Sequence, residues 1–247
     1  MAGVRPPWAL GGYCMMIFYL ASSRRMIPFV PAPLEVADVL PGFTLSGLYA
    51  ASYNTGAFGA LSEFSAFPAL VRYRKKKGFY VPCSRVESME DTYFHKGVWG
   101  LHQEKAAFEW KQEKSRYILT VQSGGEKIIE IRLSAKRLSL PIQTSFPFFH
   151  VRGNGIVSYH ADYAARVHLS TSAVEIPEKS PLTIYGFNRK LLTTFWESSK
   201  IVLHSPESEN IVIPEGVSEG IFKIGQEQRE SCGVKKSADE CSSCHIV

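Results

Sequence analysis

Short apolar runs alternate with turn residues along most of the chain, and long stretches with the 3.6-residue period of a helix are scarce. Runs rich in β-branched and aromatic residues favour strands. We predict strands at residues 117–122, 128–133, 155–159 and 165–174. The sequence SGGE at 123–126 predicts a hairpin turn between the first two strands.

Helices are predicted to be few and short. Prolines at 141, 147, 177, 181, 206 and 214 argue against long helices in the second half. Residues 33–40 carry an acidic first turn after a proline, which is typical of a helix start. Residues 104–111 and 188–197 are two further predicted helices. Together these elements predict a mainly β fold with a few short helices, closer to a barrel than to a sandwich.

The length of 247 residues, with 45% hydrophobic and 21% charged residues, is that of one soluble globular domain. No apolar run is long enough for a membrane-spanning helix. The apolar stretch 13–21 lacks a small-residue cleavage site, so we interpret it as a buried strand rather than a signal peptide. We predict a domain over residues 1–222. A loose tail at 223–247 is expected because that segment has few large apolar residues.

Charge and cysteine content limit the kinds of binding partner and the cellular compartment that we expect. The net charge is +5, and the densest basic cluster is RYRKKK at 72–77. We interpret this cluster as a solvated turn between strands and expect no nucleic-acid partner, because no aromatic-basic ladder accompanies it. Five cysteines without a secretory signal indicate a reducing, cytoplasmic compartment. No metal site or cofactor is predicted, because the spacings of His95, His150, His160 and His168 to acids and cysteines match no metal motif.

Three segments occur in an order that resembles the acetoacetate decarboxylase family, over about residues 5–205. They are PPWALGG at 6–12, FTLSGLYAASY at 43–53 followed by LSE, and GFYVP at 78–82 followed by GVWGLHQEKAAFEW at 97–110. The resemblance implies a cone-like antiparallel β-barrel that encloses a mostly apolar pocket, often in a homo-oligomer. In active members a lysine in that pocket forms a Schiff base with a β-keto acid.

The chain departs from the family at that lysine. The family pattern of tryptophan, glycine, leucine, proline and lysine reads WGLHQ at 99–103, which places Gln103 at the nucleophile. An amide nitrogen does not form an iminium. Lys105 shares a face with Gln103 if the segment is extended, but not if it is helical. The alternative for Lys105 is a solvent-facing side chain beside Glu104.

Only some of the family's other site residues have a counterpart in this chain. An acid matches at Glu63, within the mainly apolar run 57–71, where desolvation would favour the neutral form and suit proton delivery. The alternative is a strand-end carboxylate that reaches water. Tyr13 stands where an arginine is expected, and Gly47 stands where a second glutamate is expected. The resemblance thus implies catalytic roles for Glu63, Lys105 and His102. His102 would act as an acid or base, and the alternative is that it only forms structural hydrogen bonds. Pocket positions are implied for Gln103, Tyr13 and Trp99.

The chain ends CSSCHIV, with Cys244 four residues from the end. This spacing fits a prenylation box, with Cys241 as a palmitoylation site and two lysines upstream at 235 and 236. Two lipids would hold a domain stably at a membrane surface. The alternative is an unmodified tail with two exposed thiols.

Two classes of function remain open from the sequence. The first is an enzyme, either a β-keto acid decarboxylase (a lyase) that uses Lys105 or a derived acid–base catalyst that uses Glu63. The second is a non-catalytic protein that binds an apolar ligand. A plant protein needed for neoxanthin formation, which the chain is similar to, also lacks the lysine. We therefore expect a divergent family member, a pseudoenzyme for classical Schiff-base decarboxylation, whose pocket takes a keto acid or an isoprenoid-like ligand.

Overall fold

The computed structural model describes residues 6–56, 59–88, 101–152 and 155–210. Its strands form one 14-stranded sheet. They are β1 (Trp8–Ser22), β2 (Glu35–Val36), β3 (Phe43–Gly56), β4 (Leu61–Phe67), β5 (Leu70–Tyr73), β6 (Lys76–Tyr80), β7 (Cys83–Val86), β8 (Gln103–Lys105), β9 (Ala107–Glu113), β10 (Arg116–Ser123), β11 (Glu126–Arg152), β12 (Gly155–Glu175), β13 (Lys190–Leu203) and β14 (Glu207–Asn210).

The strand order is β2-β5-β6-β11-β12-β13-β1-β3-β4-β7-β8, with β10 and β14 added to β11 and β12, and β9 added to β10. Most pairs are antiparallel, whereas β6–β11 and β7–β8 are parallel. The predicted mainly β fold is confirmed. The expected antiparallel β-barrel describes this sheet only loosely, because the sheet of the described residues is mixed and its order runs from β2 to β8 without closing.

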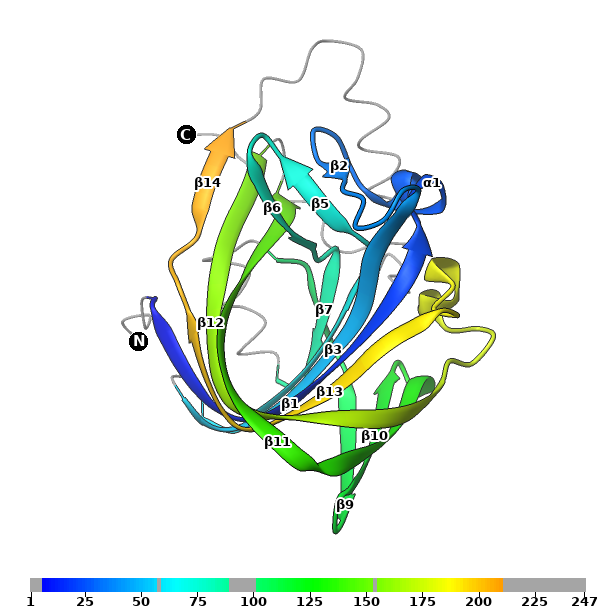
Figure 1. Cartoon of the computed structure of the whole chain (residues 1–247), viewed down its shortest axis with the longest axis vertical. Helices are drawn as coiled ribbons and strands as arrows, with labels where there is room; N and C mark the ends of the chain where they lie inside the picture. The colour runs from blue at the N-terminus through cyan, green and yellow to red at the C-terminus, as the bar shows by residue number, and fades with distance from the viewer. Residues whose placement is uncertain (1–5, 57–58, 89–100, 153–154, 211–247) are drawn as a thin grey trace, which may run out of the picture.

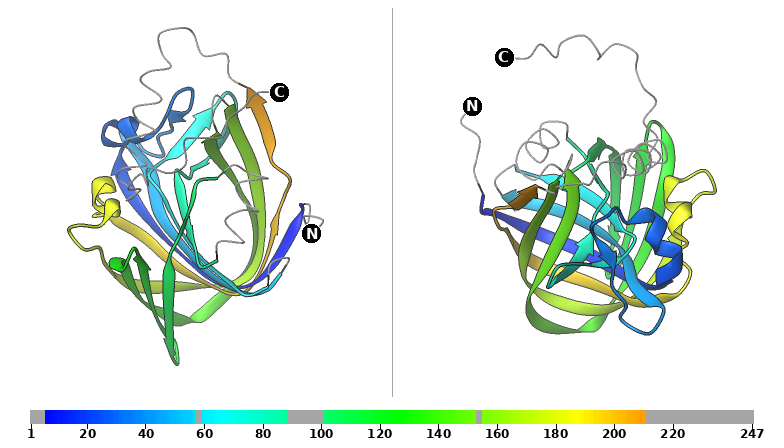
Figure 2. Two further views of the ribbon diagram at one scale, coloured as in Figure 1. Left: turned by 180° about the vertical axis from the view of Figure 1, so that it is seen from behind. Right: turned by 90° about the horizontal axis from the view of Figure 1, so that it is seen from above.

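The sheet bends into a cup (Figures 1 and 2). The long strands β11 and β12 rise along one wall, and β1 and β3 rise along the other. The strands β11 and β12 are paired along most of their length, from Arg152↔Gly155 to Glu130↔Glu175. A pair of this length can run from one wall of the cup through the bend.

Both faces of the central strands are buried. Side chains alternate along β1, so that Met15 and Ile17 join one hydrophobic cluster while Cys14 and Met16 join another on the opposite face. The first cluster includes β9, β10, the start of β11 and the 3-10 helix η2 (Pro181–Tyr185). The second lies inside the cup, against β12 and β13.

The predicted strands are confirmed. The run 117–122 lies in β10, 128–133 in β11, and 155–159 and 165–174 in β12. The hairpin turn at 123–126 is also confirmed, with Gly124 and Gly125 at φ of 60° and 83°. Such positive φ values suit the glycines of a two-residue hairpin.

The three predicted helices are wrong. Residues 33–40 contain β2, 104–111 contain parts of β8 and β9, and 188–197 contain the start of β13. Tertiary pairing overrides local preference, since β13 lies between β12 and β1 and pairs with both. The helices described are instead α1 (Ser23–Met26) and the 3-10 helices η1 (Ile27–Phe29) and η2.

Within the described residues, the helices are all too short to span a membrane. The predicted tail 223–247, with Cys241 and Cys244, lies outside the described residues, and so does Trp99. The proposed lipidation and the boundary at residue 222 therefore stay predictions.

Candidate functional site

A pocket inside the cup holds about 740 Å³ of space between protein atoms, its open mouth included. Its walls come from β1, β3, β4, β6, β11, β12 and β13, together with the segment before β8. Most of the lining is aromatic or aliphatic. Phenylalanines and a leucine form the largest part of this apolar wall: Phe18, Phe67, Phe79, Phe146, Phe148 and Leu101.

Phe79 lies at the centre of the apolar wall. Its ring centroid lies 4.7 Å from that of Phe67, 6.0 Å from that of Phe146 and 6.2 Å from that of Phe148. The parallel pairing of β6 with β11 sets Phe79 directly beside Phe148. Two segments far apart in sequence thus supply one continuous apolar surface.

The polar end of the pocket is built around Glu63. Its Oε1 accepts hydrogen bonds from the hydroxyls of Ser84 at 2.9 Å and Ser65 at 3.4 Å. Its Oε2 accepts one from the Tyr53 hydroxyl at 3.3 Å, and the Tyr53 and Tyr49 hydroxyls lie 2.6 Å apart. The pairing of β4 with β7 aligns Ser65 with Ser84, which places their hydroxyls on the same face as Glu63.

Burial raises the pKa of the Glu63 carboxyl above its ordinary 4.5. The hydrogen bonds from Ser84, Tyr53 and Ser65 oppose that effect in part. Burial also raises the pKa values of Tyr49 and Tyr53 well above 10, so both phenols stay protonated. This end of the pocket can therefore donate a proton or a hydrogen bond to an oxygen atom of a ligand.

Gln103 is buried, with 3% of its surface exposed, on the short strand β8. It pairs in register with Ser84 of β7, and its side chain therefore lies on the same face as the Ser84 hydroxyl. Neither atom of its amide has a hydrogen-bond partner in the part of the chain that the structure describes. Gln103 itself is outside the set of residues that line the pocket.

Lys105 lies at the end of β8, two residues beyond Gln103 in an extended segment. The geometry that would let it share a face with Gln103 is thus present. Its side chain, however, is exposed, and the described lining of the pocket does not include it.

His102 points to the other face of β8. It lies 3.6 Å from Glu104, which also lies 3.1 Å from the buried guanidinium of Arg85. Because side chains alternate along an extended strand, His102 and Glu104 are separated from Gln103 and from the Glu63 end of the pocket.

Tyr13 lies on the face of β1 opposite the pocket. Its ring contacts Trp110 edge to face at 5.2 Å and lies 5.8 Å from the rings of Tyr117 and Phe195. The pocket residues of β1 are instead Met16 and Phe18. Of the site residues expected from the sequence, the structure thus places Glu63 in the pocket. The tyrosines at 49, 53 and 163 were missed, although the alternation of 43–53 could have put the first two on one face.

Gly47 leaves no room for the second glutamate of the family. A Cβ at this position would lie 2.3 Å from the Phe67 ring and 2.6 Å from the carbonyl oxygen of Ile17. Phe67 lines the pocket. An aromatic wall therefore closes against Gly47, where the resemblance would place a carboxylate.

Comparison with known proteins identifies the fold. No family model matches the chain, and no curated protein matches it. Among solved structures, acetoacetate decarboxylase from Legionella pneumophila subsp. pneumophila str. Philadelphia 1 superposes with a TM-score of 0.71 at 13% identity, over 85% of this chain and 92% of that one.

Two further solved structures are similar. The enduracididine biosynthesis enzyme MppR has a TM-score of 0.65 at 13% identity, over 84% of this chain and 89% of that one. An acetoacetate decarboxylase-like enzyme from Sphingomonas wittichii RW1 has a TM-score of 0.58 at 12% identity, over 83% and 93% of the two chains. The chain thus has the acetoacetate decarboxylase-like fold that the resemblance implied.

Proposed function

We propose, from the acetoacetate decarboxylase-like fold and the composition of its pocket, that this protein binds an apolar, isoprenoid-like ligand with an oxygen-bearing end. In this proposal Glu63 delivers a proton to that oxygen, and no lysine forms a Schiff base. The observation that carries the proposal is the position of Glu63 at the polar end of an aromatic pocket.

The lining favours a hydrocarbon ligand over a small keto acid. Sites for small apolar molecules are concave and lined mainly by hydrophobic and aromatic side chains, as this pocket is. A β-keto acid also brings a carboxylate, which would meet Glu63 in a lining whose described residues include no lysine or arginine. A buried charge without a partner is costly. A neutral ketone, alcohol or epoxide avoids that cost.

The proposed chemistry is general acid catalysis. A protonated Glu63 would donate to the ligand oxygen, and the hydroxyls of Tyr53 and Tyr49 extend the hydrogen-bonded chain behind it. The phenylalanine wall would exclude water from the carbon skeleton, which strengthens the hydrogen bond and protects reactive intermediates. Isomerisation of an epoxide to an allylic alcohol fits this arrangement: the C–O bond breaks as Glu63 protonates the oxygen, and the resulting Glu63 carboxylate takes a proton from the neighbouring carbon as the C=C bond forms, so that no cofactor is needed.

Calorimetric titration with β-ionone, a neutral isoprenoid ketone, tests the binding step. We expect saturable binding, weakened about tenfold in Glu63→Leu, which corresponds to about 1.4 kcal/mol for the lost hydrogen bond. The matched control is Glu197→Leu, because the Glu197 carboxylate is half-exposed and outside the pocket. Equal affinities in wild type and Glu63→Leu would contradict a role for the Glu63 carboxyl.

Borohydride trapping tests the exclusion of Schiff-base chemistry. We expect no adduct after incubation with acetoacetate and borohydride, as read by intact mass and peptide mapping. A stable adduct on Lys105 would instead support the alternative function, β-keto acid decarboxylation, and would overturn the proposal.

A further inference from the structure

A cluster of two histidines and an aspartate lies on the outside of the cup. His160 and Asp162 belong to β12, and His204 directly follows β13. One ligand atom from each of the three, two imidazole nitrogens and a carboxylate oxygen, lies within 4.8 Å of the others. The pocket and the Glu63 chemistry use none of these residues.

Strand alternation creates the cluster. Tyr159 and Tyr163 of β12 line the pocket, so that His160 and Asp162 face the opposite side of the sheet. The backbone N–H of His204 donates to the carbonyl of His160 at 3.1 Å, which holds the chain beyond β13 beside β12. The cluster and the pocket are thus built on the two faces of one strand.

The three side chains are already held together. Nε2 of His204 lies 2.7 Å from Oδ2 of Asp162, and the rings of His160 and His204 stack at 4.1 Å with 20° between their planes. About one third of the His204 side chain and one half of the Asp162 side chain are exposed. Rotation of these exposed side chains would bring the three ligand atoms onto one ion, and solvent gives that ion a path of entry.

We propose that His160, Asp162 and His204 form a binding site for a divalent transition-metal ion such as Zn²⁺. Neutral imidazole and carboxylate are established ligands of zinc and of ferrous iron, and two histidines with one carboxylate are a recurrent set that leaves coordination positions open. Glu207, the nearby acid of β14, pairs with Lys76 at 2.8 Å and is not one of the ligands. The bound ion would link β12 to the end of β13, directly behind Tyr159 and Tyr163.

A second group with suitable atoms is less favourable. Cys83, His102 and Glu104 also offer three atoms within 4.8 Å of one another. There the guanidinium of Arg85, which is 3% exposed, lies 3.1 Å from the Glu104 carboxylate. A fixed cation at that distance neutralises the carboxylate and repels a metal ion.

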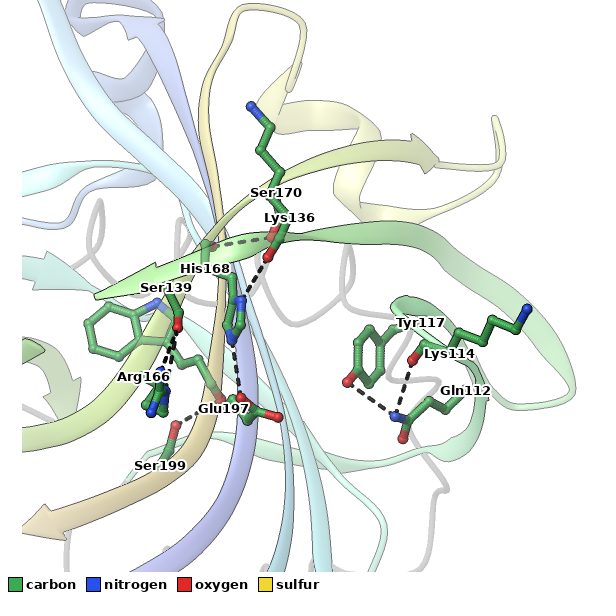
Figure 3. Close-up of polar contacts among 11 residues, drawn as sticks. Gln112, Lys114, Tyr117, Lys136, Ser139, Arg166, His168, Ser170, Glu197 and Ser199 are labelled. Atoms are coloured by element: carbon green, nitrogen blue, oxygen red, sulfur yellow. Dashed lines mark hydrogen bonds and ion pairs between the residues drawn. The ribbon is translucent and has the colours of Figure 1, made fainter. Parts of the chain in front are cut away.

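His168 provides a matched control (Figure 3). Its Nε2 lies 3.1 Å from Oε2 of Glu197, across the same two strands β12 and β13. Its Nδ1 lies 2.8 Å from the backbone carbonyl of Lys136, which occupies the second ring nitrogen. This pair resembles the His204–Asp162 pair, but no second histidine joins it among the described residues.

Isothermal titration of the full chain with ZnCl₂ tests the proposal. We expect one saturable site whose affinity falls at least about tenfold in His160→Ala and in His204→Ala, since even loss of an outer-shell partner costs 10–100-fold. His168→Ala is expected to bind Zn²⁺ like the wild type. Circular dichroism spectra of all three variants should match that of the wild type.

Titration with Co²⁺ separates this site from the cysteines of the chain. The proposed site predicts d–d absorption bands without a thiolate charge-transfer band. The proposal is overturned if Zn²⁺ affinity is unchanged in His204→Ala, if His168→Ala weakens it equally, or if the Co²⁺ spectrum shows thiolate ligation that His204→Ala leaves intact.

Discussion

At the scale of single residues, Glu63 is subject to two opposing influences. Removal from water favours the neutral acid, while three hydroxyl donors favour the carboxylate. The net effect raises the pKa in the folded state above the ordinary value. Glu63 therefore binds its proton more tightly in the folded protein than in the unfolded chain.

This difference predicts a pH dependence of stability. Stabilisation from protonated Glu63 is complete below the unfolded pKa of about 4.5 and is lost as the pH rises through the higher folded pKa. Each unit of pKa increase corresponds to about 1.4 kcal/mol. Glu63→Gln has no titrating carboxyl at this position. We therefore expect its free energy of unfolding to increase relative to that of the wild type as the pH rises from 4 to 7. Urea unfolding of both proteins at several pH values measures this difference in free energy of unfolding. A difference that stays the same from pH 4 to 7 would contradict the raised pKa of Glu63.

Gly47 predicts a steric limit at the pocket wall. A methyl group at this position meets the Phe67 ring and the backbone of Ile17 at less than 3.0 Å. We expect Gly47→Ala to lower the free energy of unfolding by about 1–3 kcal/mol, as overpacking does. Urea unfolding measures the loss, and an unchanged midpoint would show that Phe67 can move aside.

Some site residues could be predicted from the sequence, and others could not. Glu63 could be predicted because a single acid in a mainly apolar run is expected either in a pocket or at the end of a strand, where it reaches water. The face of Tyr13 could not, because both faces of β1 are buried, and alternation groups Tyr13 with Met15 and Ile17 without saying which face borders the pocket. His204 lies 42 positions from Asp162, and only the pairing of β12 with β13 brings the two together.

At the scale of elements, a buried ion pair links β7 to β8. Arg85 and Glu104, side by side in the parallel register, have 3% and 11% of their side chains exposed. Removal of one partner from a buried pair leaves an uncompensated charge, which typically costs about 3–5 kcal/mol. We expect a loss of this size in the free energy of unfolding of Glu104→Gln.

The exposed pair of Arg72 and Glu35 is the control for that measurement. It also joins neighbouring strands through an arginine and a glutamate, but its side chains are 51% and 65% exposed. Glu35→Gln is expected to cost about 0–1 kcal/mol. Equal losses in the two variants, measured by chemical denaturation at pH 7, would show that burial does not set the strength of the β7–β8 link.

The type of each element could be predicted where the side-chain pattern was strong. The hairpin of β10 and β11 follows from its β-branched runs and two glycines. The segment that became β13 has no such alternation, and its pairing with β12 and β1 decided its conformation. Pro141 and Pro147 lie inside β11, whose one edge pairs with β12. On the opposite edge, β10 pairs only with the start of β11 and β6 only with residues near its end, so within the described residues the middle of that edge is free of a paired strand and tolerates proline.

At the scale of the whole molecule, one sheet separates a structural core from a pocket. Phe195 and Trp196 are neighbours in β13 and belong to different hydrophobic clusters on the two faces. The face with Phe195 is closely packed, with its ring stacked on Tyr117 at 4.2 Å. The other face keeps an open volume that ligand could fill. Stability and ligand binding should therefore respond to different substitutions.

Phe195→Ala and Phe148→Ala test this separation. Phe195 is 2% exposed, so its truncation should lower the free energy of unfolding by about 3–5 kcal/mol and leave the affinity for β-ionone unchanged at temperatures where the variant is folded. Phe148 is half-buried and already borders the pocket. Its truncation adds to existing space, so we expect a smaller loss of stability and weaker β-ionone binding. If both variants weakened binding equally, the two faces would be coupled through the sheet, and the pocket would depend on the packing behind it.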